Sequence, residues 1–171
     1  MYVQADAAQL EWRTAVELSQ DAIGIQEILE KQDVHSLNQV AFTLPSRLIA
    51  KIYLFRTIFR GSGWSFAHDP AFSHVSSSPE YWEQVNDKFY SKYSGLNGQH
   101  FIWKECVLNG LPIVSPFGRE WLIPYEDKIP WTILSNYPVQ GTGADLMTLA
   151  RVVFMKRLRS IKGWEQVVLT T

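Results

Sequence analysis

The segment Pro45–Arg60 constrains the fold most, because a helix-start signal is followed by side chains that repeat every four residues. Proline is favoured at a first helical position, and Gly61-Ser62-Gly63 marks the end of the segment. Residues four apart lie on one face of a helix. The side chains on that face are, in order, Arg47, Lys51, Phe55 and Phe59. We therefore expect a helix with cations near its start and aromatic rings one and two turns later.

This polarity suits a nucleoside triphosphate, which has phosphates at one end and a stackable base at the other. Arg47 and Lys51 would bind phosphate near the helix N-terminus, whose dipole also favours anions. Phe55 and Phe59 would form a stacking platform for a base. The alternative is an ordinary amphipathic helix whose aromatic rings belong to the core. Taken alone, the helix favours that alternative.

The rest of the chain is mostly helical in pattern, so the expected class is α+β with helix dominant. Helices are expected at Leu10–Leu29, His35–Phe42, Tyr81–Tyr93 and Gly143–Ile161. Strands are expected at Tyr2–Ala5, Leu111–Ser115, Arg119–Pro124 and Gln166–Thr171, the middle two forming a hairpin around Pro116-Phe117-Gly118. Asn136–Gly141 is expected to be a loop that leads into the last helix.

Composition limits the class of protein. The 171 residues are 46% apolar, which suits one domain or a piece of a larger one. The net charge of −1 excludes a uniformly basic nucleic-acid binder. A single Cys106 excludes an internal disulfide framework and a cysteine-based zinc site. The sequence contains neither a signal peptide nor a membrane-spanning run, so a cytoplasmic protein without a membrane partner is expected.

Charge is unevenly distributed along the chain. Residues 1–33 hold seven acids and two bases, whereas residues 34–68 hold four bases and no acid. Residues 146–164 hold five bases and again no acid. An acidic site facing basic segments would suit an enzyme that uses a metal and phosphate. Solvated helix faces are the alternative, which charge alone favours.

Three further groups of residues could carry chemistry. Asp6, at the end of an expected strand, and the nearby Glu11 offer oxygen ligands of the kind Mg²⁺ prefers, although Asp6 could equally be a helix N-cap. The polar stretch Asn136–Asp145 could be a binding loop or only a helix start. His35 could be a phosphate donor, a metal ligand or a surface histidine.

Taken in order, these segments resemble four motifs of the family A DNA polymerases, the family of bacterial DNA polymerase I and many phage polymerases. Asp6-Ala-Ala-Gln9-Leu-Glu11-Trp-Arg13 resembles motif A, Asp-Tyr-Ser-Gln-Ile-Glu-Leu-Arg. Asp33-Val-His35-Ser resembles the Asp-Ile-His-Thr element. The segment from Arg47 to Gly61 resembles motif B, Arg-x₃-Lys-x₃-Phe-Gly-x₂-Tyr-Gly. Asn136-Tyr-Pro-Val-Gln140-Gly-Thr-Gly-Ala-Asp145 is similar to Asn-Ala-Pro-x-Gln-Gly-Thr-Ala-Ala-Asp. Phe117-Gly118-Arg119 also looks like the family's Phe-Gly-Arg.

The resemblance implies template-directed DNA synthesis from dNTPs on primer–template DNA, with two Mg²⁺ ions in the complete enzyme. Asp6 and the Ala7 carbonyl would bind metal, and Asp6 and Lys51 would be catalytic. Gln9 and Glu11 would line the sugar pocket, with Glu11 as the steric gate. His35, Arg47 and Lys51 would contact the triphosphate, Phe55 the nucleotide and Phe59 the templating base. Asn136 and Gln140 would contact DNA, and the complete enzyme could use a processivity factor.

Departures from the family pattern also matter. Ala7, Ala8 and Arg56 stand where the family has Tyr, Ser and Gly, which suggests a phage lineage and hence a host cytoplasm. Motif C, a His-Asp pair, is expected beyond the last strand, so the chain is interpreted as a fragment. It would comprise a palm segment (1–33), fingers (34–135) and a return to the palm (136–171) of a right-hand polymerase fold.

Rival interpretations are a non-catalytic nucleic-acid-binding module, a helical interaction domain using the stripe Tyr81–Tyr93, and a single-subunit RNA polymerase. Within the resemblance, Glu11 and Phe55 argue against the RNA polymerase, because they belong to a pocket that selects deoxynucleotides.

Overall fold

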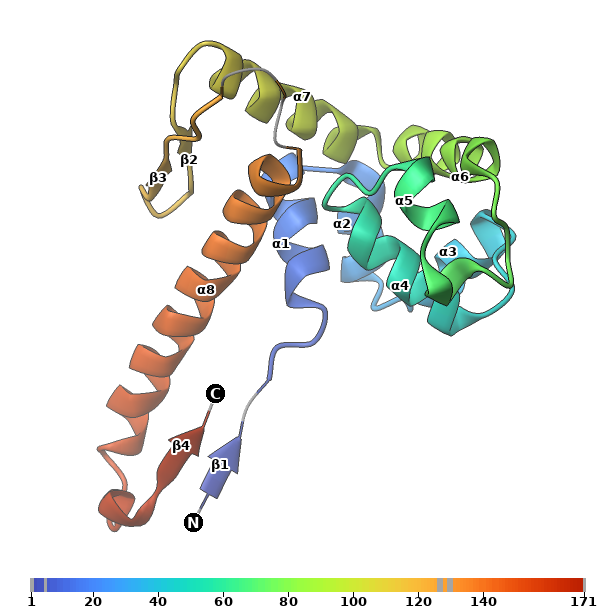
Figure 1. Cartoon of the computed structure of the whole chain (residues 1–171). Coiled ribbons are helices and arrows are strands. Elements are labelled where there is room, and N and C mark those ends of the chain that lie inside the picture. The colour runs from blue at the N-terminus through green and yellow to red at the C-terminus, as the bar shows by residue number, and fades with distance from the viewer. Residues whose placement is uncertain (1, 5, 126–127, 129–130, 171) are drawn as a thin grey trace.

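The computed structural model describes residues 2–4, 6–125, 128 and 131–170, and its ribbon is mainly helical (Figure 1). In chain order the elements are β1 (Tyr2–Gln4), α1 (Leu10–Ser19), α2 (Ala22–Leu29), α3 (Val34–Ala41), α4 (Arg47–Thr57), α5 (Gly63–Ala67), η1 (Pro70–Phe72), α6 (Pro79–Lys92), α7 (Ser94–Leu108), β2 (Ile113–Val114), β3 (Glu120–Trp121), α8 (Trp131–Leu158), η2 (Trp164–Gln166) and β4 (Val168–Thr170). The expected α+β, helix-dominant class is confirmed.

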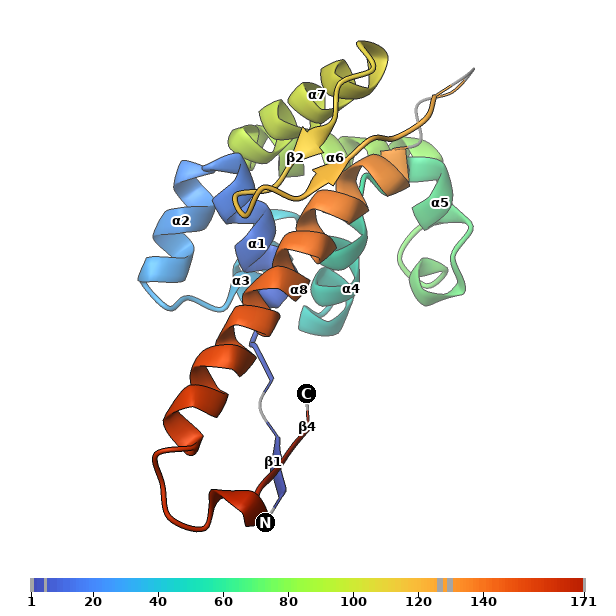
Figure 2. The ribbon, with the colours of Figure 1, turned by 90° about the vertical axis from the view of Figure 1, so that its left-hand side faces the viewer.

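The molecule consists of a helical cluster from which α8 extends as a long arm (Figures 1 and 2). At the far end of this arm β1 and β4 pair in parallel, with Tyr2 opposite Val168, so the two ends of the chain lie close together. Both expected terminal strands are therefore present, although Ala5 and Thr171 lie outside the described residues. None of the helices in the described part of the chain is long and apolar enough to cross a membrane.

An aromatic core fixes the inner face of α4. Tyr53 is fully buried, and its ring lies 5.1 Å from that of Phe66 in α5 and 5.9 Å from that of Trp82 in α6, centroid to centroid. Its hydroxyl donates to Oδ1 of Asn86 in α6 over 2.9 Å, which satisfies the buried polar group. Because this face is buried, Lys51 and Phe55 are left exposed on another face of the helix.

Two predicted helix boundaries in the first third of the chain are wrong. The helix expected over Leu10–Leu29 is two helices, because Gln20 has a left-handed backbone (φ 49°) and Asp21 starts α2 as its N-cap. Pro45 is not the first residue of α4. Ser46 is the N-cap, and its Oγ accepts a hydrogen bond from the Ile49 amide over 3.2 Å. The helix also ends at Thr57 instead of Arg60.

The loop expected at Asn136–Gly141 is also wrong, because α8 runs through it without a break. Pro138 lies inside the helix, where proline removes one backbone hydrogen bond and crowds the preceding turn. Leu134, Pro138 and Val139 are buried, and α8 packs against α1 and α7, so tertiary packing offsets this cost. The predicted hairpin is confirmed but short, with Ile113 opposite Trp121.

Candidate functional site

A cavity of about 330 Å³, which we call the α1–α4 cavity, lies where the start of α1, the start of α3 and the middle of α4 meet. Seven of the residues that the sequence marks as a site line it: Asp6, Ala7, Gln9, Glu11, His35, Lys51 and Phe55. They come from three motifs separated by up to about 50 positions in the chain. The fold therefore brings the motif A, Asp-Val-His and motif B residues to one place.

The segment before α1 delivers the acidic residues to this cavity. It follows β1, and Asp6 lies exposed at its end. Gln9 has φ 57°, a left-handed backbone that costs a residue with a side chain of the order of 1 kcal/mol or more. Such strain is concentrated at binding sites, and Gln9 lines the α1–α4 cavity. Glu11, half-buried in the first turn of α1, lines the same cavity.

The donors present fit only part of a divalent-metal site. In the part of the chain that the structure describes, no three His, Cys, Asp or Glu side chains are grouped closely enough to hold a metal ion. Asp6 offers a single carboxylate, beside the carbonyl of Ala7. Mg²⁺ keeps most of its waters unless several oxygen ligands converge. These residues alone would hold such an ion weakly.

His35 is buried in the wall of the cavity and is suited to act as a neutral donor. It stands in the first turn of α3, whose N-cap is Asp33. Burial, with smaller effects from the charges of Arg47 and Lys51, lowers the pKa of His35 below its usual 6.5 despite the opposing charge of Asp33. Its Nδ1 has no hydrogen-bond partner within the described residues. A ligand in the cavity could supply that partner.

Arg47 is separated from the other predicted phosphate ligands. Its guanidinium makes two hydrogen bonds to Asp33, at 2.6 Å from Nε and 3.0 Å from Nη2. This pairing holds the pKa of Asp33 well below its usual range. Arg47 lines a neighbouring cavity that shares Gln9 and Trp12 with the α1–α4 cavity. It would have to leave Asp33, or share it, to reach a phosphate beside Lys51.

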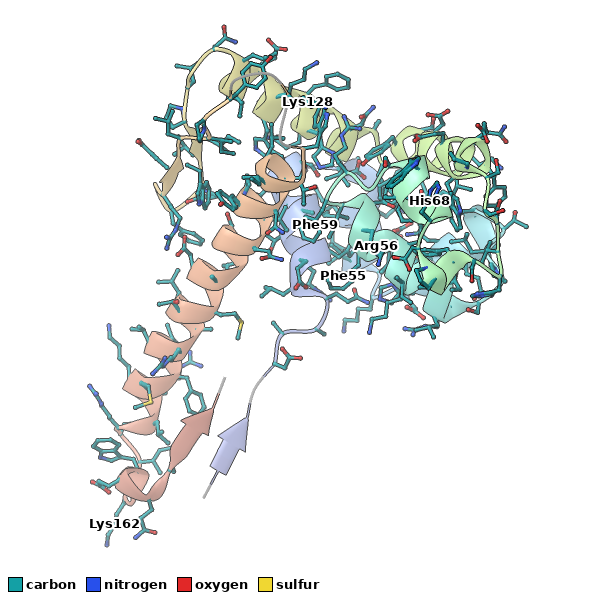
Figure 3. The ribbon with its side chains drawn as sticks, in the orientation of Figure 1. Phe55, Arg56, Phe59, His68, Lys128 and Lys162 are labelled. Carbon is teal, nitrogen blue, oxygen red and sulfur yellow. The ribbon has the colours of Figure 1, made fainter. Side chains whose placement is uncertain are left out.

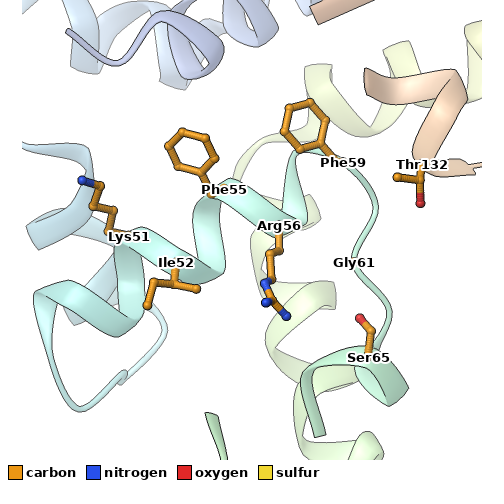
Figure 4. Close-up of a pocket in the computed structure, with 8 residues that line it drawn as sticks. All are labelled: Lys51, Ile52, Phe55, Arg56, Phe59, Gly61, Ser65 and Thr132. Atoms are coloured by element: carbon orange, nitrogen blue, oxygen red, sulfur yellow. The ribbon is translucent and has the colours of Figure 1, made fainter. Parts of the chain in front are cut away.

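A second cavity of about 580 Å³, the α4–α5 cavity, lies on the other side of Lys51 and Phe55, which line both cavities. Figure 4 shows Phe55 and Phe59 on one side of α4, Ile52 and Arg56 on the other, and Ser65 of α5 facing Arg56. In the wider view Arg56 lies nearer to α5 than either phenylalanine does (Figure 3). Phe59 thus belongs to this second cavity. Arg56 is a lining residue that the sequence singled out only as a departure from the family pattern.

Asn136 and Gln140 lie on α8, half-buried and exposed respectively. Among the described residues that line the two cavities, neither appears. The hairpin β2–β3 packs against this part of α8. Arg119 makes two hydrogen bonds to Asp145, at 3.1 and 2.5 Å, and the Trp121 ring lies against Gly141. The hairpin therefore fixes the helix that carries Gln140.

Comparison with known proteins agrees with this arrangement. No family model matches the chain. In sequence, it is 25% identical over 170 residues to DNA polymerase I of Aquifex aeolicus (strain VF5), covering 92% of this chain and 29% of that protein. In structure, it matches the POL domain of Pol1 from M. smegmatis in complex with DNA primer-template and dNTP, with a TM-score of 0.75 and 19% identity. That match covers 91% of this chain and 29% of the other, so the chain spans less than a third of either protein. The sequence match, the shared fold and the four motifs identify the chain as a segment of the DNA polymerase I-like, family A type.

Proposed function

We propose that the chain forms the nucleotide-selecting part of a template-directed DNA polymerase. In this reaction the primer 3′-hydroxyl attacks the α-phosphate of a dNTP, a new P–O bond forms, and pyrophosphate leaves. The observation that carries the proposal is the gathering of seven motif residues around the α1–α4 cavity. Residues so far apart in sequence would not meet at one cavity if each motif were only a helix start or core segment.

The chemistry of the lining supports a role for each residue. Lys51 and neutral His35 would bind the triphosphate, with Arg47 beside them once it leaves or shares Asp33. Gln9 and Glu11 would bound the sugar, and Phe55 would lie against the nucleotide. Phe59 would face the templating base in the α4–α5 cavity. Asn136 and Gln140 would contact the primer–template from α8.

Asp6 and the Ala7 carbonyl would supply one side of the metal site. Two Mg²⁺ ions in a complete enzyme would activate the primer hydroxyl and neutralise charge on the leaving oxygens. The described residues supply a single carboxylate toward them, so further ligands would have to come from elsewhere in a polymerase. We assign 1–33 to the palm, 34–135 to the fingers and 136–171 to a return to the palm. The last boundary falls inside α8.

The test is dNTP affinity in a Lys51→Ala variant. Loss of a charge-assisted phosphate contact costs about 1.5–3 kcal/mol, or roughly tenfold to a hundredfold in affinity. We expect dNTP binding to weaken by that factor while the affinity for primer–template DNA stays unchanged. The matched control is Lys88→Ala, an exposed lysine of α6, which should change neither. Equal loss of both affinities in Lys51→Ala would contradict the assignment.

A non-catalytic nucleic-acid-binding module is the second candidate, favoured by the single carboxylate at Asp6. It predicts that nucleotide binding is weak and independent of Mg²⁺. Titration of dNTP with and without Mg²⁺, repeated in Asp6→Asn, separates the two functions. The polymerase assignment requires tighter binding with the ion, and the Asp6→Asn change should remove that gain.

A further inference from the structure

We propose that Arg56 binds a backbone phosphate of the unpaired template strand in the α4–α5 cavity, and that Asp69 competes with that phosphate for its guanidinium. The inference rests on the proposed polymerase function, because it assumes that the ligand of this cavity is a nucleic-acid strand. It adds a phosphate contact at a position where the family pattern has glycine and no side chain could make one.

The lining of the α4–α5 cavity suits a planar, negatively charged ligand. Phe55 and Phe59 offer ring faces, and Lys51 and Arg56 offer positive charge (Figure 4). Among the described residues that line this cavity, no side chain is acidic. Aromatic faces stack with bases, and cations pair with phosphates. A nucleotide unit of a single strand satisfies both requirements at once.

Arg56 is held in place but remains available. Its guanidinium forms an ion pair with Asp69 and lies 5.6 Å from the centroid of the Phe72 ring. The Arg56 side chain is 42% exposed, whereas that of Asp69 is 16% exposed. Arginine has five N–H donors, and within the described residues Asp69 is its one hydrogen-bonding or ionic partner. Donors are therefore left for an incoming phosphate.

Asp69 is anchored independently of Arg56. It is the N-cap of η1, and its Oδ1 accepts a hydrogen bond from the Ala71 amide over 2.7 Å. Its carboxylate consequently stays near the cavity when a strand arrives. A fixed carboxylate beside a phosphate site repels the phosphate and competes for the same donors. Removal of the Asp69 charge should thus strengthen strand binding, and removal of the Arg56 charge should weaken it.

The experiment measures DNA binding by the 171-residue chain with fluorescence anisotropy. The probes are a labelled primer–template with a single-stranded 5′ template overhang and the corresponding blunt duplex, each titrated over about 50 to 200 mM salt. For Arg56→Gln we expect a several-fold weaker affinity for the overhang probe. The slope of log K against log salt should become smaller by about 0.7, as for one lost contact to a single strand. Blunt-duplex affinity should not change.

Asp69→Asn keeps an acceptor oxygen for the Ala71 amide but loses the charge, and we expect it to bind the overhang several-fold more tightly. The double variant should bind like Arg56→Gln alone. Lys88→Gln, which removes one exposed positive charge outside the cavity, is the control and should match the unaltered chain. Arg56→Lys, which retains the charge, should retain most of the affinity. Thermal melting of each variant checks that folding is retained.

The results separate this inference from the function on which it rests. If the unaltered chain binds neither probe, both fail. If it binds the overhang but Arg56→Gln leaves the affinity and the salt slope unchanged, only the inference fails. The inference also fails if Asp69→Asn weakens binding as much as Arg56→Gln does, because the pair would then be only a structural brace.

Discussion

The indole ring of Trp121 occupies the space that a side chain at Gly141 would need. A Cβ added at Gly141 would collide with Cζ2 of that ring and lie 3.2 Å from its Cη2. Glycine in a helix interior costs about 1 kcal/mol relative to alanine. Its presence in α8 is explained by the close approach of the hairpin, which a larger residue would push away.

Gly141→Ala should therefore destabilise the protein although alanine is the better helix former. We expect the free energy of unfolding to fall by about 1–3 kcal/mol, as for overpacking of a tight contact. Gly98→Ala in α7 is the matched control, because a Cβ there meets nothing within 4 Å. That change should raise the free energy of unfolding by about 0.5–1 kcal/mol. Denaturant unfolding of both variants decides the point, and a stabilised Gly141→Ala would be evidence against the contact.

His100 should make the protein less stable in mild acid. The side chain is fully buried, and its Nε2 must donate to the Ile58 carbonyl, 3.2 Å away. Burial, together with the Arg60 charge, lowers the pKa of His100 to about 3 from its usual 6.5. Between these two values the unfolded chain binds a proton that the folded chain does not. The free energy of unfolding contributed by this residue is thus complete above pH 6.5 and falls by up to about 1.4 kcal/mol per pH unit below it.

The measurement is unfolding by urea between pH 7.5 and pH 4 in the unaltered chain and in His100→Gln. Glutamine can still donate to the Ile58 carbonyl but cannot titrate, so its stability should depend less on pH in this range. His74→Gln, at an exposed histidine, should leave the pH dependence as it is. Identical pH profiles for His100→Gln and the unaltered chain would refute the assignment.

The local patterns that the sequence predicts well are those set by residues close together along the chain. The spacing of Lys51, Phe55 and Phe59 indicates a helix, and the turn at Pro116-Phe117-Gly118 indicates a hairpin. Both are present. The motif order also predicted which segments meet at the α1–α4 cavity, because the resemblance carries a three-dimensional arrangement that spacing alone does not.

What the sequence could not predict depends on contacts between distant segments. Pro138 and its polar neighbours favour a loop, and only the packing of α8 on α1 and α7 makes a helix there. The pairing of Arg47 with Asp33 joins residues 14 positions apart through the turn between α3 and α4. The pairing of Arg56 with Asp69 likewise depends on how η1 folds back on α4.

Asp21 should contribute more to stability than a single helix cap, because one carboxylate serves two helices. It is buried and accepts hydrogen bonds from the Gly24 amide at 2.9 Å in α2 and from the Gly95 amide at 2.8 Å in α7. Asp21→Ala would leave both donors buried without a partner, and we expect a loss of about 2–4 kcal/mol in the free energy of unfolding. Ser62→Ala removes one ordinary cap, that of α5, and should cost only about 1 kcal/mol. Equal losses in the two variants would show that the second helix gains nothing from Asp21.

Glu11 should control selection of the sugar. It lines the α1–α4 cavity in the first turn of α1, where its aliphatic stem would fill the space that a ribose 2′-hydroxyl needs. In a polymerase assembled from this chain and the remaining segments of a family A enzyme, Glu11→Ala should raise ribonucleotide incorporation relative to deoxynucleotide. The ratio of the two kcat/KM values is the measurement. Glu17→Ala, on the exposed surface of the same helix, is the control, and unchanged selectivity in Glu11→Ala would remove the steric-gate role.

The 171-residue chain by itself should not synthesise DNA. A two-metal site needs carboxylates on both sides of the ions, and within the described residues Asp6 stands without a second acidic ligand grouped beside it and Glu11. The chain also spans only 29% of the length of the DNA polymerase I that it resembles, so a primer–template would contact a small part of the usual surface. Primer extension with the purified chain should give no product. Extension should appear when a family-type segment beginning with His-Asp and a thumb are supplied, and Asp6→Ala should abolish it. Extension by the chain alone that Asp6→Ala removes would mean that Asp6 and its immediate neighbours suffice, and the requirement for a second carboxylate would then be wrong.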